Sequence, residues 1–286
     1  MKVVLFCGGL GLRIRDFSES VPKPLVPLGP RPMLWHVMKY YSHFGHKDFV
    51  LCLGHQGEAI KRFFLNYDEC LSNDFVFSEG GKKLLLSNSD IHDWKITFAE
   101  TGTDSNIGQR LKAVQKYVEG EEIFLANYTD GLTDLHLPAL IEHFEKRDSV
   151  ASFLSARPNL SFHIVSASKD GRVEKIQEMT HANLRINSGY FAFRKSIFKY
   201  LREGEELVRE PFQRLIQEKR LLAYEYDGFF QAMDTFKDRQ QLENLLGSGF
   251  APWELWKAPS AGSHSVATNV PGSRKGKRSP AGNGHA

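Results

Sequence analysis

The apolar positions of the chain recur with two different spacings, and each spacing predicts a type of element. Short apolar runs followed by glycine, as at Val3–Phe6 and Asp48–Leu53, indicate strands buried on both faces of a sheet. Apolar residues three and four positions apart indicate amphipathic helices. In the first half these patterns predict strands at 3–6, 48–53, 95–99 and 122–127, and helices at 32–44, 57–66 and 108–118. This alternation favours a Rossmann-like α/β fold, a mostly parallel mixed sheet with helices on both faces.

The pattern changes after residue 150, where strands become more frequent than helices. It predicts strands at 150–155, 162–166, 173–177, 190–193 and 222–226, and helices at 195–202, 210–218 and 235–246. We expect one domain over residues 1–257 with halves at 1–145 and 146–257, and ligands at the carboxyl ends of the strands. Residues 258–286 are rich in Ser, Gly, Pro and basic residues without periodicity, so we predict a disordered basic tail.

Composition and charge narrow the class of protein. The 286 residues are 41% hydrophobic and 25% charged, which is ordinary for a globular chain and excludes a fibrous or wholly disordered one. The net charge of +3 comes from the tail, which carries four basic residues and no acid. The body is therefore close to neutral, and we expect no nucleic-acid partner.

The cysteines and the hydropathy indicate a compartment. Three cysteines, Cys7, Cys52 and Cys70, are too few and too scattered for a disulfide framework or a zinc site. A reducing, cytoplasmic environment fits them best. No apolar run approaches the length of a membrane span, so no membrane association is expected.

A glycine-rich loop follows the first predicted strand. Gly8, Gly9 and Gly11 can turn backbone N–H groups toward an anion and let a phosphate approach closely. The loop is not a dinucleotide fingerprint, because Ile14 stands where the third glycine would be, and it lacks the GK[ST] of a Walker A loop. A plain tight turn is the alternative interpretation.

A lysine between two prolines lies a few residues further on. Pro22 and Pro24 restrict the backbone on both sides of Lys23, so its ammonium group would be held near the glycine loop. A fixed ammonium group there could neutralise triphosphate charge. The alternative is a surface lysine in a proline-rich loop.

Two isolated acids, Asp130 in YTDG and Asp234 in QAMDT, stand at the ends of predicted elements. Two carboxylates that converge on phosphates would hold Mg²⁺, which takes few protein ligands and keeps several waters. The alternatives are an Asx-turn for Asp130 and a helix N-cap for Asp234. Arg110, at the start of a predicted helix, could contact a phosphate or a base.

Together, the segments GGLGLR, PKP, TDG and MDT resemble the sugar-1-phosphate nucleotidylyltransferases, and most of all their glucose-1-phosphate cytidylyltransferase branch. The resemblance covers most of residues 1–257 and includes 32–39, Thr101-Gly102 with Arg110, and the closing APW at 251–253. It implies the nucleotidyltransferase fold, with a nucleotide-binding half at 1–145 and a sugar-phosphate-binding half at 146–257. The tail lies outside it.

The resemblance also implies an activity, in which CTP and α-D-glucose 1-phosphate give CDP-glucose and pyrophosphate with Mg²⁺ as cofactor. By resemblance, the nucleotide is bound by Gly8, Gly9, Gly11, Arg13, Lys23 and Arg110, the metal by Asp130 and Asp234, and the sugar phosphate by Glu178, Arg185 and Asn187. The catalytic set would be Arg13, Lys23 and Asp130. The relatives commonly form homo-oligomers, although this sequence does not itself fix an oligomeric state.

Three positions depart from the family pattern. Leu12 replaces a hydroxyl residue, Thr129 replaces a glycine and adds bulk beside the expected metal, and Met179 replaces the lysine that would pair with the sugar phosphate. We expect Arg185 to take over from that lysine. The departures leave alternatives open: another nucleotide or phosphorylated acceptor, or a paralogue that binds nucleotide without turnover. A nicotinamide-dependent oxidoreductase is a further alternative.

Overall fold

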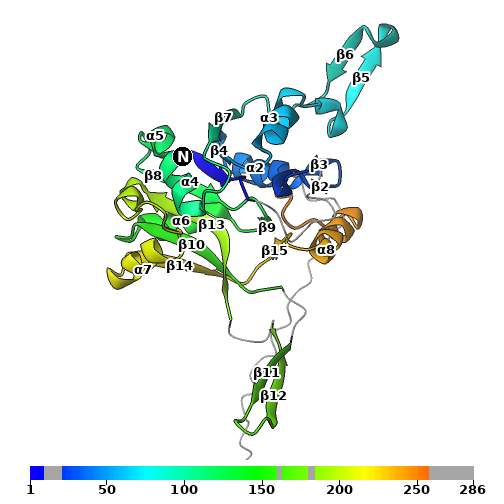
Figure 1. Cartoon of the computed structure of the whole chain (residues 1–286). Coiled ribbons are helices and arrows are strands. Elements are labelled where there is room, and N and C mark those ends of the chain that lie inside the picture. The colour runs from blue at the N-terminus through cyan, green and yellow to red at the C-terminus, as the bar shows by residue number, and fades with distance from the viewer. Residues whose placement is uncertain (10–20, 160–162, 180–183, 258–286) are drawn as a thin grey trace, which may run out of the picture. The chain divides into compact units, whose positions relative to one another are not determined.

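A seven-stranded sheet, in the order β14-β10-β13-β8-β1-β4-β7, forms the centre of the protein (Figure 1). The structure, a computed structural model, describes residues 1–9, 21–159, 163–179 and 184–257. The strands are β1 (Val3–Phe6), β4 (Asp48–Leu53), β7 (Lys95–Glu100), β8 (Ile123–Asn127), β10 (Ala151–Ala156), β13 (Ile186–Arg194) and β14 (Leu221–Tyr226). Within this sheet β13 runs antiparallel to its neighbours, and the other pairs are parallel. The predicted mostly parallel mixed sheet is confirmed.

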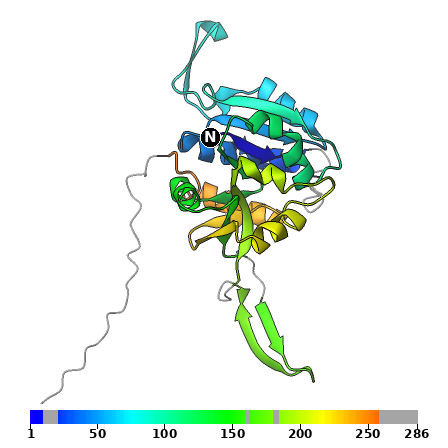
Figure 2. The ribbon, with the colours of Figure 1, turned by 90° about the vertical axis from the view of Figure 1, so that its left-hand side faces the viewer.

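Helices cover both faces of this sheet, because successive side chains of a buried strand point to opposite sides (Figure 2). Val3 and Leu5 pack in one core and Val4 and Phe6 in the other. The first core includes residues of α2 (Met33–His43), α3 (Gly57–Leu65), α6 (Leu137–Glu145) and α8 (Phe236–Gly247). The second includes residues of α4 (Ile107–Ala113), α5 (Gln115–Val118), α7 (Glu210–Gln217) and the 3-10 helix η6 (Lys195–Lys199).

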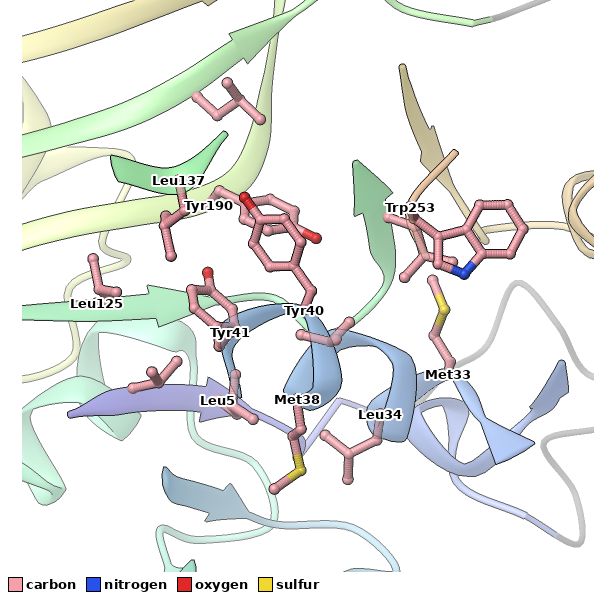
Figure 3. Close-up of a cluster of buried hydrophobic side chains, with 14 of the residues drawn as sticks. Leu5, Met33, Leu34, Met38, Tyr40, Tyr41, Leu125, Leu137, Tyr190 and Trp253 are labelled. Carbon is pink, nitrogen blue, oxygen red and sulfur yellow. The ribbon is translucent and has the colours of Figure 1, made fainter. Parts of the chain in front are cut away.

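Tyrosines in the first core tie the sheet to the loop that follows β8 (Figure 3). The rings of Tyr40 on α2 and Tyr190 on β13 lie 5.6 Å apart, edge to face. Both hydroxyl groups are buried, and the hydroxyl of Tyr190 donates to the carbonyl oxygen of Gly131 at 2.8 Å. Since a buried hydroxyl group without a partner is costly, this bond fixes the backbone next to Asp130.

Two predicted helices were wrong in form. The single helix expected at 108–118 is two helices, α4 and α5, which meet at Val114, where the backbone has φ −95° and ψ 4°. The apolar spacing of Leu111, Val114 and Val118 continues across this break, so periodicity could not show it. The segment expected as a helix at 195–202 is the shorter η6.

Several short elements were not predicted at all. They are the 3-10 helices η2 (Lys23–Leu25), η3 (Glu69–Leu71) and η4 (Glu79–Gly81), and the strand pairs β2–β3 (Pro27–Leu28, Arg31–Pro32), β5–β6 (Phe75–Ser78, Lys83–Leu86) and β9–β15 (Gly131–Thr133, Phe230–Ala232). A further hairpin, β11–β12 (His163–Ala167, Val173–Glu178), matches two predicted strands. Elements of two to four residues are too short for a periodic signal.

The compact unit formed by the chain spans Met1–Trp256. Its division into nucleotide-binding and sugar-phosphate-binding halves stays a prediction. Gly11, Leu12, Arg13 and the tail at 258–286 lie outside the described residues. None of the helices in the described ranges combines the length and apolar character that crossing a membrane requires.

Candidate active site

The short strand pair β9–β15 brings two distant aspartates together. Asp130 directly precedes β9, and Asp234 follows β15 with one residue, Met233, between them. Gly131 pairs with Ala232 in this antiparallel ladder, and the N–H of Met233 donates to the carbonyl oxygen of Asp130 at 2.7 Å. The two acids therefore lie next to each other at the carboxyl end of β8, the edge of the sheet where ligands bind in α/β folds.

Lys23 lies between the two carboxylates. Its Nζ is 2.8 Å from Oδ2 of Asp130 and 2.6 Å from Oδ1 of Asp234. The lysine begins the 3-10 helix η2, with Pro22 in an extended conformation before it and Pro24 within the helix. Only 17% of its side chain is exposed, so the alternative of a surface lysine is wrong. The flanking prolines restrict the backbone that carries this ammonium group.

The charge of Lys23 is stabilised by its two partners. Burial by itself would lower the pKa of the ammonium group, because it disfavours the charged form. The charges of Asp130 and Asp234 and their hydrogen bonds outweigh burial, and the pKa of Lys23 is held above its ordinary value. The ammonium group of Lys23 thus keeps its positive charge at neutral pH, between the two acids.

The two carboxylates fit a magnesium ion that is completed by substrate. Among the described residues, no group of three or more His, Cys, Asp or Glu side chains could hold a metal. Mg²⁺, however, commonly uses only one or two protein carboxylates together with waters and phosphate oxygens. Asp130 and Asp234 supply hard oxygen donors from separate segments, and their side chains are 28% and 36% exposed in a shared cavity.

The structural alternatives for the two aspartates do not describe this arrangement. The N-cap of α8 is Thr235, whose hydroxyl accepts from the N–H of Asp238 in a capping box, so Asp234 is not the capping residue. Asn127 makes the Asx-type hydrogen bond before the loop, accepting from the N–H of Thr129 at 2.6 Å. The carboxylate of Asp130 instead accepts from Lys23.

Thr129 holds the Asp130 loop against the end of β1. It adopts a left-handed backbone conformation, with φ +66°, which is costly for a β-branched residue. Its side chain is buried, and the hydroxyl donates to the carbonyl oxygen of Phe6 at 3.0 Å. The expected extra bulk beside the metal is thus largely packed into the protein.

Arg110 joins the loops that follow three parallel strands. Its guanidinium group is 2% exposed and donates five hydrogen bonds, to the carbonyl oxygens of Gly8, Leu53, Gly102 and Thr103 and to the hydroxyl of Thr101. An added Cβ at Gly8 would lie 2.2 Å from this group, so Gly8 must be glycine to admit the arginine. Arg110 positions the glycine loop, and its direct contact with a nucleotide stays a prediction.

A cavity of about 490 Å³ lies beside these groups. The two glycines that begin the loop, Gly8 and Gly9, line it together with Lys23, Asp130 and Asp234. Gly9 has open space where a Cβ would be, as close approach of a ligand requires. Elsewhere the wall includes Ile107, Arg110, Tyr128 and Glu206. The structure thus brings together the predicted loop, lysine and acids.

A second, wider cavity of about 740 Å³ shares Asp234 with the first. Glu178, at the end of β12, lines it, and its role in binding the acceptor stays a prediction. Its wall also contains the amide side chains of Asn159, Gln231 and Gln241. Carboxylate and amide groups of this kind suit the hydroxyl groups of a sugar.

Arg185 and Asn187 have other partners in the structure. The guanidinium group of Arg185 donates to the carbonyl oxygens of Ser155 and Tyr226 and to Oδ1 of Asp227, at 2.9 to 3.1 Å. These contacts do not support the expected contact with a sugar phosphate. The side-chain oxygen of Asn187 accepts from the N–H of Gly189 at 3.0 Å.

Three charged residues in the cavities, Glu206, Lys237 and Asp238, were not singled out from the sequence. Glu206 lies in a segment without periodicity before α7, where no sequence signal could have placed it. Lys237 lines the wider cavity and follows Asp234 by three residues. Its proximity to the MDT segment was a signal that could have been used.

Comparisons with known proteins agree with this geometry. The family model for nucleotidyl transferases matches residues 2–238. The chain is 36% identical over 259 residues to glucose-1-phosphate cytidylyltransferase of Salmonella typhimurium, covering 90% of this chain and 100% of that protein. It is 33% identical over 258 residues to a Bacillus subtilis protein named "Probable glucose-1-phosphate cytidylyltransferase", with the same coverage. The crystal structure of HddC from Yersinia pseudotuberculosis has a TM-score of 0.60 at 20% identity, covering 86% of this chain and 99% of that one, and supports the fold.

Proposed function

Because the chain belongs to the nucleotidyl transferase family, we propose that it transfers the cytidylyl group of CTP to α-D-glucose 1-phosphate. A phosphate oxygen of the sugar phosphate attacks the α-phosphorus of CTP. The bond from that phosphorus to the oxygen bridging it to the β-phosphorus breaks, and pyrophosphate leaves with the bonding electrons. Family membership removes the oxidoreductase alternative. The convergence of Lys23, Asp130 and Asp234 beside a glycine loop is the observation that carries the proposal.

Lys23 is assigned to the phosphates of the nucleotide. Its ammonium group is held at the cavity wall by a restricted backbone, so it can bind phosphate oxygens and offset charge that develops on the departing pyrophosphate. Arg13 is assigned the same role by resemblance alone. Gly8 and Gly9 would offer backbone N–H groups to the triphosphate, with Gly8 set in place by Arg110.

Asp130 and Asp234 are assigned to Mg²⁺. When bound, the metal would neutralise phosphate charge and draw the reacting phosphates together. The aspartates themselves fix where such an ion can bind, because the β9–β15 pairing and the tyrosine hydrogen bond to Gly131 hold their backbones. Asp234 lines both cavities, a position that suits a reaction that joins a nucleotide to a second phosphorylated substrate.

Glu206 supports cytosine as the base. Its carboxylate lies in the wall of the smaller cavity, near the start of α4, where it accepts weakly from the N–H of Ile107 at 3.4 Å. A carboxylate accepts a hydrogen bond from the exocyclic amino group of cytosine, whereas uracil and thymine present a carbonyl oxygen at that position. We therefore assign Glu206 to the cytosine amino group.

The compartment and the assembly belong to the same proposal. Cys7, Cys52 and Cys70 are free, and free cysteines are typical of a reducing compartment, so we propose the cytoplasm. The homo-oligomer expected from the resemblance stays a prediction.

The proposal is tested by mass spectrometry of the products formed from each of the four common nucleoside triphosphates with a panel of sugar 1-phosphates. CDP-glucose and pyrophosphate should form fastest, and only when Mg²⁺ is present. A different product would identify the alternative nucleotide or acceptor. Binding of CTP without release of pyrophosphate from any pair would identify a paralogue that binds nucleotide without turnover.

A further inference from the structure

The wider cavity has an unfavourable charge for a phosphorylated ligand. Three carboxylates line it, those of Glu178, Asp234 and Asp238. Among its described lining residues, Lys237 carries the one permanent positive charge, and His163 is the other basic side chain. A sugar 1-phosphate is a dianion near neutral pH, so it needs a cation to enter this space.

Protein donors bind the carboxylates of Asp234 and Asp238. The carboxylate of Asp238 accepts from the backbone N–H groups of Asp234 and Thr235 at 3.1 and 2.8 Å. Asp234 accepts from Lys23 on the side of the smaller cavity. An ionised carboxylate cannot donate a hydrogen bond to a phosphate oxygen, so Asp234 and Asp238 cannot hold the phosphate.

The backbone of Lys237 is fixed close to the expected reaction centre. Lys237 is the second residue of α8, and the capping box between Thr235 and Asp238 sets the first turn on which it lies. Asp234 immediately precedes this turn, and among the residues that the structure describes it is the one that lines both cavities, so the backbone links Lys237 closely to it. A phosphate bound at Lys237 would therefore lie on the acceptor side of Asp234.

We propose that Lys237 binds the phosphate of the sugar 1-phosphate acceptor, an inference that rests on the proposed function. An ammonium group on a flexible stem suits a phosphate as a point charge. The assignment accounts for two observations at once: residue 179 is a methionine, and the guanidinium group of Arg185 is engaged with Ser155, Tyr226 and Asp227. The acceptor phosphate is then held from α8.

The test is steady-state kinetics of the full chain with CTP, Mg²⁺ and α-D-glucose 1-phosphate. Lys237→Gln should raise KM for glucose 1-phosphate about 10- to 100-fold, the range expected for loss of a charged hydrogen bond, and leave KM for CTP within about twofold. Lys237→Arg should recover most of the loss, which a merely structural role would not predict. Lys146→Gln, at an exposed lysine on α6, is the matched control and should change neither constant.

The outcomes separate this inference from the proposed function. If the unmodified protein turns over CTP and glucose 1-phosphate while Lys237→Gln leaves both KM values unchanged, the assignment of Lys237 is overturned and the function stands. If both KM values rise equally, Lys237 acts on the whole site and the assignment is again overturned. If the unmodified protein releases no pyrophosphate with any nucleotide and sugar phosphate, the proposed function fails, and the inference with it.

Discussion

The ammonium nitrogen of Lys23 lies 2.6 Å from the carboxylate of Asp234, a residue 211 positions further along the chain. The same nitrogen is 2.8 Å from Asp130, so the lysine lies at the point where the two acids converge. That is also the region in which a metal ion bound by both acids would lie. The ammonium group of Lys23 therefore offsets the charge of the two acids, and the proposed binding of Mg²⁺ to both acids would require it to move toward the phosphates.

Replacing Lys23 should make the stability of the protein depend on magnesium. In Lys23→Met two partly buried carboxylates lose their counterion, and we expect the free energy of unfolding to fall by about 1–3 kcal/mol, less than for a fully buried pair. Added Mg²⁺ should restore part of the loss by binding the aspartates in the folded state. Thermal unfolding in EDTA and in MgCl₂ measures both effects.

The control for this prediction is Lys47→Met, which breaks an exposed ion pair with Asp93. Its unfolding temperature should change little and should not respond to Mg²⁺ beyond the response of the parent. A Lys23→Met variant as stable in EDTA as the parent would show that the lysine does not offset the charge of the acids.

Asp130 should be required for turnover rather than for folding. Asp130→Asn keeps the size of the side chain and the backbone hydrogen bond to Met233 but removes the negative charge of a metal ligand. We expect kcat to fall at least about 100-fold, with the unfolding temperature within a few degrees of the parent. Asp93→Asn serves as the control on the surface. Full activity of Asp130→Asn across a Mg²⁺ titration would remove Asp130 from the site.

At position 129, glycine should give a more stable protein than alanine, which is the reverse of the usual order of the two residues. Both Thr129→Gly and Thr129→Ala lose the hydrogen bond to Phe6, but only glycine relieves the left-handed conformation at φ +66°. We expect the glycine variant to be more stable than the alanine variant by about 1 kcal/mol. Denaturant unfolding of the two variants measures the difference. An alanine variant more stable than the glycine variant would mean that the loop relaxes to another conformation.

The sequence predicted the sheet better than the contacts of the site. β1 and β4 were predicted because strands buried on both faces need continuous apolar runs, and that requirement is local. The aspartates of the TDG and MDT segments could be named as candidate site residues. The strand pair β9–β15 that brings them together, however, has only three residues in each strand. No periodic signal exists at that length, so their contact came only from the structure.

The partners of charged side chains could not be predicted from the sequence either. Arg110 was expected to contact a phosphate or the base of the nucleotide, and Arg185 a sugar phosphate, because an arginine in a sequence shows its charge but not its partners. In the structure each guanidinium group donates to backbone carbonyl oxygens of residues that are distant in sequence. Lys237 and Glu206, by contrast, line the cavities without having been singled out.

Glu206 should determine the choice of base. Glu206→Gln replaces a pure acceptor with a side chain that can also donate, so it can bond the carbonyl oxygen of uracil as well as the amino group of cytosine. We expect the ratio of kcat/KM for CTP over UTP to fall about 10-fold or more. Glu203→Gln, at an exposed acid three positions earlier, is the control. An unchanged ratio would show that other groups read the base.

His46, in the turn after α2, should make the protein sensitive to mild acid. Burial and, secondarily, the N-terminal ammonium lower its pKa to about 4, from 6.5. Between these values the unfolded chain binds a proton that the folded protein does not. The contribution of His46 to stability is therefore complete above pH 6.5 and decreases as the pH falls toward 4.

The shift in the pKa of His46 sets the size of its effect on the free energy of unfolding. It corresponds to at most about 3 kcal/mol, which partial exposure of the ring reduces to about 1–2 kcal/mol. His46→Gln removes the titrating group, so its unfolding temperature should fall less than that of the parent between pH 7 and pH 4.5. Protonation of carboxylates in acid destabilises the variant and the parent alike. The difference between their unfolding temperatures therefore reports the effect of His46 alone. His92→Gln, at an exposed position, should behave as the parent does. If His46→Gln loses as much stability as the parent over this range, His46 is not the group that responds to acid.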